Sequence, residues 1–93
     1  MHVAICSIEL YMPGAGSLKG KRHIIQSIIQ RIRSRINASV AETDFQDYWQ
    51  RATIGVAMVS SNKVLLEKQV NLIRDIVDNS AEAETVEFVI EYL

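Results

Sequence analysis

Two apolar periodicities alternate along this chain, and their order constrains the fold more than any other feature of the sequence. Apolar residues recur at every second position in four segments, which predicts four strands. These segments are residues 2–11, 36–43, 49–59 and 85–92. Between the first and second segments, and again between the third and fourth, the spacing changes to that of a helix. The predicted order is therefore strand, helix, strand, strand, helix, strand.

Each predicted helix follows a capping residue and carries one apolar stripe. Ser17 precedes the first helix, and Ser60-Ser61-Asn62 offers caps for the second. The first stripe, whose spacing is lost around Asn37, consists of Leu18, Ile25, Ile28, Ile29, Ile32 and Ile36. The second stripe, which ends before Asn79-Ser80, consists of Leu65, Leu66, Val70, Ile73, Ile76 and Val77. We expect both stripes to be buried.

This order predicts a ferredoxin-like α+β sandwich, with residues 1–93 forming a single domain. Right-handed crossovers place both helices on one face of a four-stranded antiparallel sheet. The third strand then lies between the first and second, and the fourth lies beside the first. The other face is half apolar and has no cover from this chain, and such a face commonly meets another subunit or a ligand, so a homodimer is a candidate. It would present Val3, Ile5, Ser7, Asn37, Ser39, Thr53, Gly55 and Ala57.

Composition removes several function classes. The net charge of −1 gives no global attraction to nucleic acid or membrane. The first apolar run lacks a basic leader, and no apolar run is long enough to span a bilayer, so we expect a cytoplasmic protein without membrane contact. Cys6 is the only cysteine, which excludes an internal disulfide, and its position on the apolar side of the first strand predicts an inert core thiol. His2 and His23 lie far apart in sequence, so we expect no metal site and no cofactor.

The charged residues are unevenly distributed. Six of the ten Lys and Arg residues lie between Lys19 and Arg35, with no acid among them, whereas residues 75–93 hold six acids and no base. One interpretation is structural: the cations border the apolar stripe, where their stems cover it and their charged ends stay in water. The other is functional, because a helix N-terminus with nearby cations suits a phosphate or carboxylate. The candidate residues for nucleic-acid or anion binding are Ser17, Lys19, Lys21 and Arg22.

The predicted topology brings the loops 11–17, 43–48 and 79–84 to one end of the sheet. The cations that start the first helix should then lie near Glu42, Asp44 and Asp47. Lys21 points close to the centre of the apolar stripe, and Glu42 shares the parity of a buried strand position, so we predict a partly buried Lys21–Glu42 pair. Loss of one partner from such a pair can cost several kcal/mol. Glu42→Ala is therefore expected to melt lower than Glu42→Ala combined with Lys21→Met.

Aromatic residues are absent from the exposed side of the predicted third strand, which argues against RNA binding in the manner of an RNA-recognition motif. Tyr48 and Trp49 precede that strand. They are interpreted as packing at the end of the core in preference to a binding platform.

Four motifs in order along the chain resemble the YlxP-like family, a bacterial family of unknown function. They are Ser17-Leu18-Lys19-x-Lys21-Arg22, Ser39-Val40-Ala41-Glu42, Asp47-x-Trp49-Gln50-Arg51-Ala52 and Val59-Ser60. The resemblance implies a ferredoxin-like fold and no established catalytic activity. Genes of the family often sit beside those for transcription elongation, translation initiation and ribosome assembly factors, which suggests by association a role near RNA or the ribosome. The motif residues Glu42, Asp47, Trp49 and Arg51 become candidates for structural or partner contacts.

The leading hypothesis is a small non-enzymatic binding protein that contacts RNA or a ribosomal component through the basic start of the first helix. The alternative hypothesis is a homodimeric regulatory module that binds a small molecule or anion, either at that helix N-terminus or on the dimerised sheet face. An enzyme has the least support, because no catalytic set of side chains is recognisable in the sequence.

Overall fold

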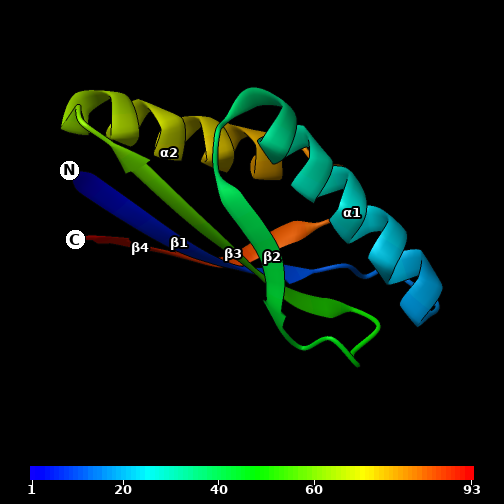
Figure 1. Ribbon diagram of the computed structural model, residues 1–93. Helices are drawn as coiled ribbons and strands as arrows, with labels where there is room; N and C mark the ends of the chain where they lie inside the picture. Colours follow the sequence, from blue (N-terminus) through cyan, green and yellow to red (C-terminus); the bar gives the residue numbers. More distant parts are fainter.

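The computed structural model describes all 93 residues as one antiparallel sheet with two helices on one face (Figure 1). The strands are β1 (His2–Tyr11), β2 (Ser39–Asp44), β3 (Arg51–Ser60) and β4 (Glu84–Tyr92), and the helices are α1 (Leu18–Arg35) and α2 (Lys63–Asp78). The order of strands in the sheet is β2-β3-β1-β4. The predicted ferredoxin-like βαββαβ topology and the predicted strand neighbours are therefore confirmed.

β1 is one of the two central strands and pairs with both β3 and β4. It pairs with β3 without interruption from His2↔Ser60 to Tyr11↔Arg51. Its pairing with β4 shifts between Glu9 and Leu10, because β4 holds one extra residue there, Val86. From Glu87 to Tyr92 the β1–β4 ladder is regular.

The core lies between the helices and the inner face of the sheet, and it contains 23 buried apolar residues. The inner residues of β1 are completely buried, as their alternation predicts: Ala4, Cys6, Ile8 and Leu10. One member of the predicted α2 stripe is wrong, because Leu65 is 47% exposed. It lies in the first turn, about 100° around the helix from Leu66, at the margin of the stripe.

Both predicted N-caps are present, and the element boundaries differ from prediction by up to three residues. The Ser17 hydroxyl accepts a hydrogen bond from the Gly20 N–H at 3.0 Å, and Asn62 caps α2 in the same way. The backbone of Ile36 is extended, which ends α1 and delays the start of β2 to Ser39. β3 begins at Arg51 and not at residue 49, so the preceding aromatic residues belong to a loop.

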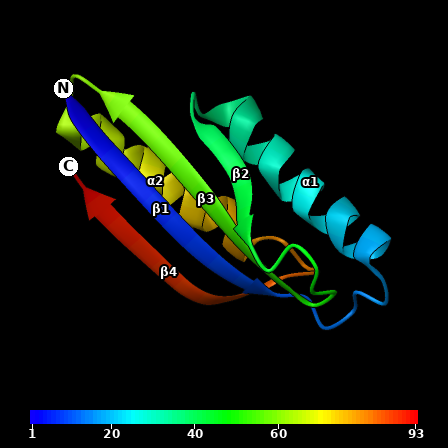
Figure 2. The ribbon, with the colours of Figure 1, turned by 60° about the horizontal axis from the view of Figure 1, so that its bottom comes forward.

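Three loops gather beside the start of α1 at one end of the sheet (Figure 2). They connect β1 to α1, β2 to β3, and α2 to β4. This confirms the predicted clustering of residues 11–17, 43–48 and 79–84. Neither helix combines the length and the apolar character that crossing a bilayer requires.

Candidate binding surface at the start of the first helix

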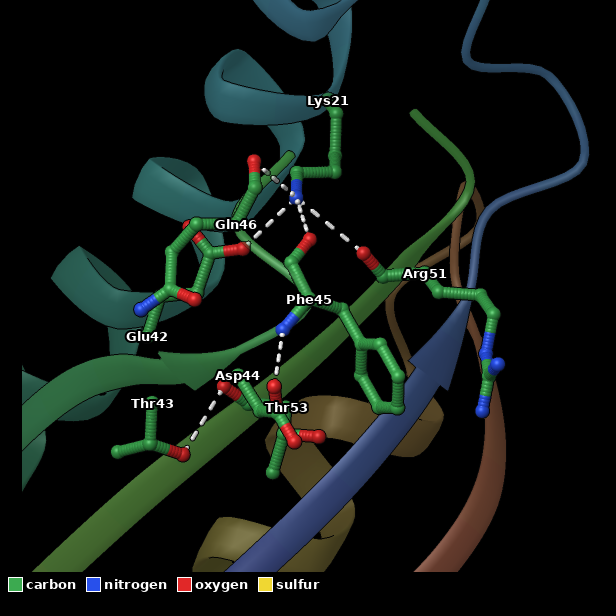
Figure 3. Close-up of polar contacts among 8 residues, drawn as sticks. All are labelled: Lys21, Glu42, Thr43, Asp44, Phe45, Gln46, Arg51 and Thr53. Carbon is green, nitrogen blue, oxygen red and sulfur yellow. Dashed lines mark hydrogen bonds and ion pairs between the residues drawn. The ribbon is translucent and has the colours of Figure 1, made fainter. Parts of the chain in front are cut away.

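Lys21 is the only charged residue buried in the structure, and it joins α1 to the β2–β3 hairpin. Its side chain has no exposed area. Its Nζ donates to Glu42 Oε2 at 2.8 Å, and to the backbone carbonyls of Phe45, Gln46 and Arg51 at 2.8, 3.1 and 3.2 Å (Figure 3). An ammonium group has three N–H donors, so these four acceptors satisfy it completely. The predicted Lys21–Glu42 pair is confirmed.

The loop that receives Lys21 has an unusual backbone conformation. Phe45 has a φ of 60°, which is uncommon for a residue other than glycine. Three hydrogen bonds hold it there: its N–H donates to Asp44 Oδ1 at 2.8 Å, and its carbonyl accepts from Lys21 and from the Tyr48 N–H. The lysine therefore stabilises a turn whose local sequence has no glycine to favour it.

This geometry overturns one functional assignment made from the sequence. Lys21 cannot contact a polyanion, because its ammonium is enclosed and all its protons have protein acceptors. The residue types at this helix start suit an anion, but one of the three cations is used to hold the fold together. Ser17 remains at the surface, with its hydroxyl oxygen already accepting from Gly20.

The other cations of α1 are exposed and have no acidic partner. The structure contains two ion pairs, Lys21–Glu42 and Arg51–Glu9, and no other α1 residue takes part in one. Lys19 and Arg22, which were expected to lie near the acids of the hairpin, form no ion pair with them. The exposed cations of α1 are Lys19, Arg22, Arg31, Arg33 and Arg35.

Two of these arginines make side-chain hydrogen bonds, Arg31 within α1 and Arg33 to β2. Arg33 donates to the Val40 carbonyl at 2.7 Å, and Arg31 donates to the Ser27 hydroxyl at 3.1 Å. Neither contact neutralises the guanidinium charge. We call the five exposed cations, which lie on both flanks of the buried stripe, the basic surface of α1.

An aromatic surface lies on the β2–β3 hairpin, at the end of the sheet where α1 begins. Tyr48 and Trp49 are each 55% exposed, so their interpretation as packing at the end of the core is wrong. Together with Tyr11, Gln50 and Arg51 they line an open depression of about 370 Å³. The side chains are exposed because both residues precede β3, which begins at Arg51, and so lie outside the sheet and its core. The predicted strand began two residues earlier.

Polar and aromatic contacts hold Arg51 beneath this surface. Its guanidinium lies 4.0 Å from the centre of the Phe45 ring and donates to Glu9 Oε2 at 3.0 Å. The Phe45 ring meets the Tyr48 ring edge to face, with centroids 5.3 Å apart. Arg51 is therefore already engaged, whereas Asp47 is exposed and unpaired.

The aromatic surface is connected to the start of α1 through Gln50. The Gln50 side-chain amide donates to the carbonyl oxygens of Pro13 and Ala15 at 3.0 and 3.4 Å, and the Gln50 backbone carbonyl accepts from the Met12 N–H at 2.8 Å. These contacts join the hairpin to the loop that leads into Ser17. Sequence reasoning missed this junction, although the position of Tyr48-Trp49-Gln50 directly before a strand was a signal that a loop could present them.

A second depression, of about 460 Å³, adjoins the N-terminus of α1. Its polar lining includes Ser17, Lys19, His23 and Glu82. Glu82 thus lies near the helix start and brings a carboxylate to the place where an anion would bind. The Cys6 thiol lies away from both depressions in the core, where burial raises its pKa above the ordinary range and Arg74 opposes that effect only in part.

Comparison with known proteins identifies the family. Residues 3–90 match the family described as "Protein of unknown function (DUF503)". The chain belongs to this family. The Bacillus subtilis (strain 168) protein named "Uncharacterized protein YlxP" is 35% identical over 82 residues, which cover 88% of this chain and 89% of that protein. The YlxP-like resemblance is therefore confirmed, and the relative's name assigns no activity that could be transferred.

A solved structure supports the fold assignment. A de novo designed protein with a ferredoxin fold matches 100% of this chain and 84% of its own, with a TM-score of 0.57 and 11% sequence identity. At this identity the likeness concerns architecture alone. Function in the DUF503 chain must be argued from its surfaces.

Proposed function

We propose that this protein is a non-enzymatic binding protein that contacts RNA, free or within a ribosomal component, through the basic surface of α1. The observation that carries the proposal is the absence of any acid on α1 and of any ion-pair partner for its five exposed cations. Unpaired surface cations gain most from phosphate, because neutralising a phosphate releases the counterions condensed on the nucleic acid.

The net charge of −1 makes this attraction local and directional. α1 contains no acid, whereas residues 75–93 hold six acids and no base, of which Glu82 lies near the start of α1 and Glu84, Glu87 and Glu91 lie on β4. A polyanion is then steered toward α1 and away from the acidic strand. Binding through five cations should weaken as salt concentration rises, with a logarithmic slope of at most about 3.5, because each single-strand phosphate contact contributes about 0.7.

The aromatic surface supports a single-stranded RNA over a duplex. Trp49 and Tyr48 expose half of their side chains at the end of the molecule where α1 begins. Exposed aromatic rings stack unpaired bases with about 1–3 kcal/mol per base, and they do so with little sequence preference. A strand whose phosphates lie on Lys19 and Arg22 could place a base on Trp49.

Salt-dependent RNA binding tests the proposal. Fluorescence anisotropy with a labelled single-stranded RNA should give an affinity that falls linearly with salt on logarithmic axes. Lys19→Ala/Arg22→Ala should reduce that slope by about 1.4, since each single-strand phosphate contact contributes about 0.7. The matched control is Lys63→Ala/Lys68→Ala, which removes the same charge from α2 and should leave most of the slope. Equal slopes in the two double variants, or no RNA binding by the wild type, would refute the proposal.

The alternative, a homodimeric module that binds a small anion, has weaker support. Its strongest feature is the depression beside Lys19 and His23, yet Glu82 lines the same depression. A carboxylate in that position repels a phosphate or carboxylate ligand.

A further inference from the structure

The outer edge of β4 is a long and unprotected row of backbone hydrogen-bonding groups. β4 pairs only with β1 and is the last strand on its side of the sheet (Figure 2). Natural sheets protect an edge with a short strand, a proline, a bulge or charged side chains, lysine above all, and the glutamates of β4 disfavour another acidic strand without disfavouring a basic one. β4 has nine residues and contains neither proline nor lysine. Its one bulged residue, Val86, lies near its start, so the edge is regular from Glu87 onward.

The hydrogen-bond pattern identifies which groups are free. Val3 and Leu93 exchange both of their backbone hydrogen bonds, at 3.4 and 2.9 Å. In an antiparallel ladder these mutual pairs alternate along the strand, so Glu87, Val89 and Glu91 also direct their N–H and C=O groups toward β1. The backbone groups of Phe88, Ile90 and Tyr92 consequently point outward, where an added strand would meet them.

The open side of β4 carries carboxylates, whereas two cations of α2 lie against aromatic rings on the helix side, where Glu67 also lies near Tyr92. Glu87 and Glu91 lie on the open face of the sheet, on either side of Val89, which is 48% exposed. On the helix side, the Arg74 guanidinium lies 4.2 Å from the centre of the Phe88 ring, and Lys63 lies 5.7 Å from that of Tyr92.

No cation of this chain neutralises the carboxylates of β4. Glu87 stands directly opposite Glu9 on β1, and Glu9 is already paired with Arg51. Neither Glu87 nor Glu91 forms an ion pair. Like charges opposed across strands destabilise a sheet, so a cation supplied from outside would relieve this arrangement.

We propose that β4 accepts an extended segment of another protein as a fifth strand, and that this segment alternates lysine or arginine with apolar residues. Its cations face Glu87 and Glu91 on the open side of the sheet. Its apolar residues extend the half-buried row of Phe88 and Ile90 on the helix side, where Arg74 disfavours a further cation. Main-chain hydrogen bonds to the three outward residues supply affinity, and the alternation supplies specificity. This site is separate from the basic surface of α1 and does not depend on RNA binding.

A second copy of this chain is a poor occupant of the same edge. Antiparallel self-pairing centred on Val89 sets Glu87 of each copy against Glu91 of the other. No register of two identical β4 strands sets an acid opposite a base, because residues 75–93 contain none. The charge pattern therefore selects a partner with the opposite sign.

A peptide of alternating lysine and valine, blocked at both ends, is the probe. It is added to the full chain, and amide hydrogen exchange is followed residue by residue by NMR. At saturation, exchange at Phe88, Ile90 and Tyr92 should slow at least tenfold, whereas Val89 and Glu91, already bonded to β1, should change little. A peptide of the same length with glutamate in place of lysine is the control and should have no effect.

Charge reversal distinguishes this edge from general electrostatic attraction. Glu87→Lys/Glu91→Lys should bind the lysine peptide about tenfold more weakly and should gain affinity for the glutamate peptide. The matched variant Asp47→Lys/Asp75→Lys changes net charge equally at two exposed positions outside β4 and should keep the wild-type preference. The proposal is overturned by protection at residues outside β4, by equal loss in both variants, or by protection of the β4 edge through dimerisation of the chain alone.

Discussion

Replacement of Lys21 by methionine is expected to destabilise the fold more than any other change to a polar side chain. Methionine keeps most of the buried volume but removes the ammonium, which leaves the carbonyl groups of the hairpin and Glu42 without their donor. Removing one partner of a buried charged pair typically costs about 3–5 kcal/mol. A chain of this length has a total stability of about 5–14 kcal/mol, so the loss is a large part of it.

Replacement of Glu42 by glutamine should cost less, about 1–2 kcal/mol. The amide oxygen can still accept a hydrogen bond from Lys21. The Glu42 side chain is 18% exposed, so water replaces part of the lost interaction. The double variant Lys21→Met/Glu42→Gln should be no less stable than Lys21→Met alone, because Glu42 has no partner once the ammonium is gone. From the sequence, Glu42→Ala combined with Lys21→Met was expected to melt higher than Glu42→Ala alone. The structure changes this expectation, because Lys21→Met also leaves three backbone carbonyls without a donor. The double variant should therefore not melt above Glu42→Ala.

Urea denaturation of the four proteins measures the coupling between the two side chains. Each kcal/mol lost should also lower the melting temperature by about 4–8 °C in a domain of this size. Hydrogen exchange at Tyr48, whose N–H donates to the Phe45 carbonyl, reports on the hairpin itself. Additive effects within about 0.3 kcal/mol, or a Lys21→Met protein as stable as wild type, would refute the reasoning.

Two further predictions concern the core thiol and the open face. Because burial raises the Cys6 pKa, the unfolded thiol ionises first, so the free energy of unfolding should fall as pH rises above about 8.5 and be unaffected below it. Cys6→Ala should reduce that slope in urea titrations at several pH values, and equal slopes would contradict the assignment. Gly55→Ala should cost about 1–3 kcal/mol, because its Cβ would lie 2.7 Å from Thr43 Cγ2. Adding Thr43→Ser, which lacks that methyl group, should recover most of the loss, and a melting temperature unchanged by Gly55→Ala would count against the clash.

The fold could be predicted from the sequence because it depends on apolar spacings that can be recognised within each segment. The alternating residues of β1 and the stripe of α1 specify which faces are buried, and the order of the six elements leaves few compact arrangements. Lys21 could be recognised as a buried cation because it interrupts an otherwise apolar stripe. The chain offered one well-placed acid, Glu42, on the neighbouring strand.

The candidate site could be predicted only in part, because loop conformation and exposure depend on the assembled structure. Nothing local indicates that Lys21 bonds three backbone carbonyls in addition to Glu42. Trp49 is a large apolar residue of the kind usually found in a core. It is exposed because β3 begins two residues later than the apolar pattern of the sequence suggests. The free edge of β4 likewise follows from strand order, which concerns the whole sheet.

The buried ammonium of Lys21 also affects how a partner would meet the surface around it. It ties the first turns of α1 to the hairpin that carries the aromatic side chains, and Gln50 adds a second tie to the preceding loop. The separation between these segments is therefore set before any encounter. A ligand that touches both needs no rearrangement of the main chain, so the entropic penalty of association is confined to the ligand and to a few side-chain rotamers.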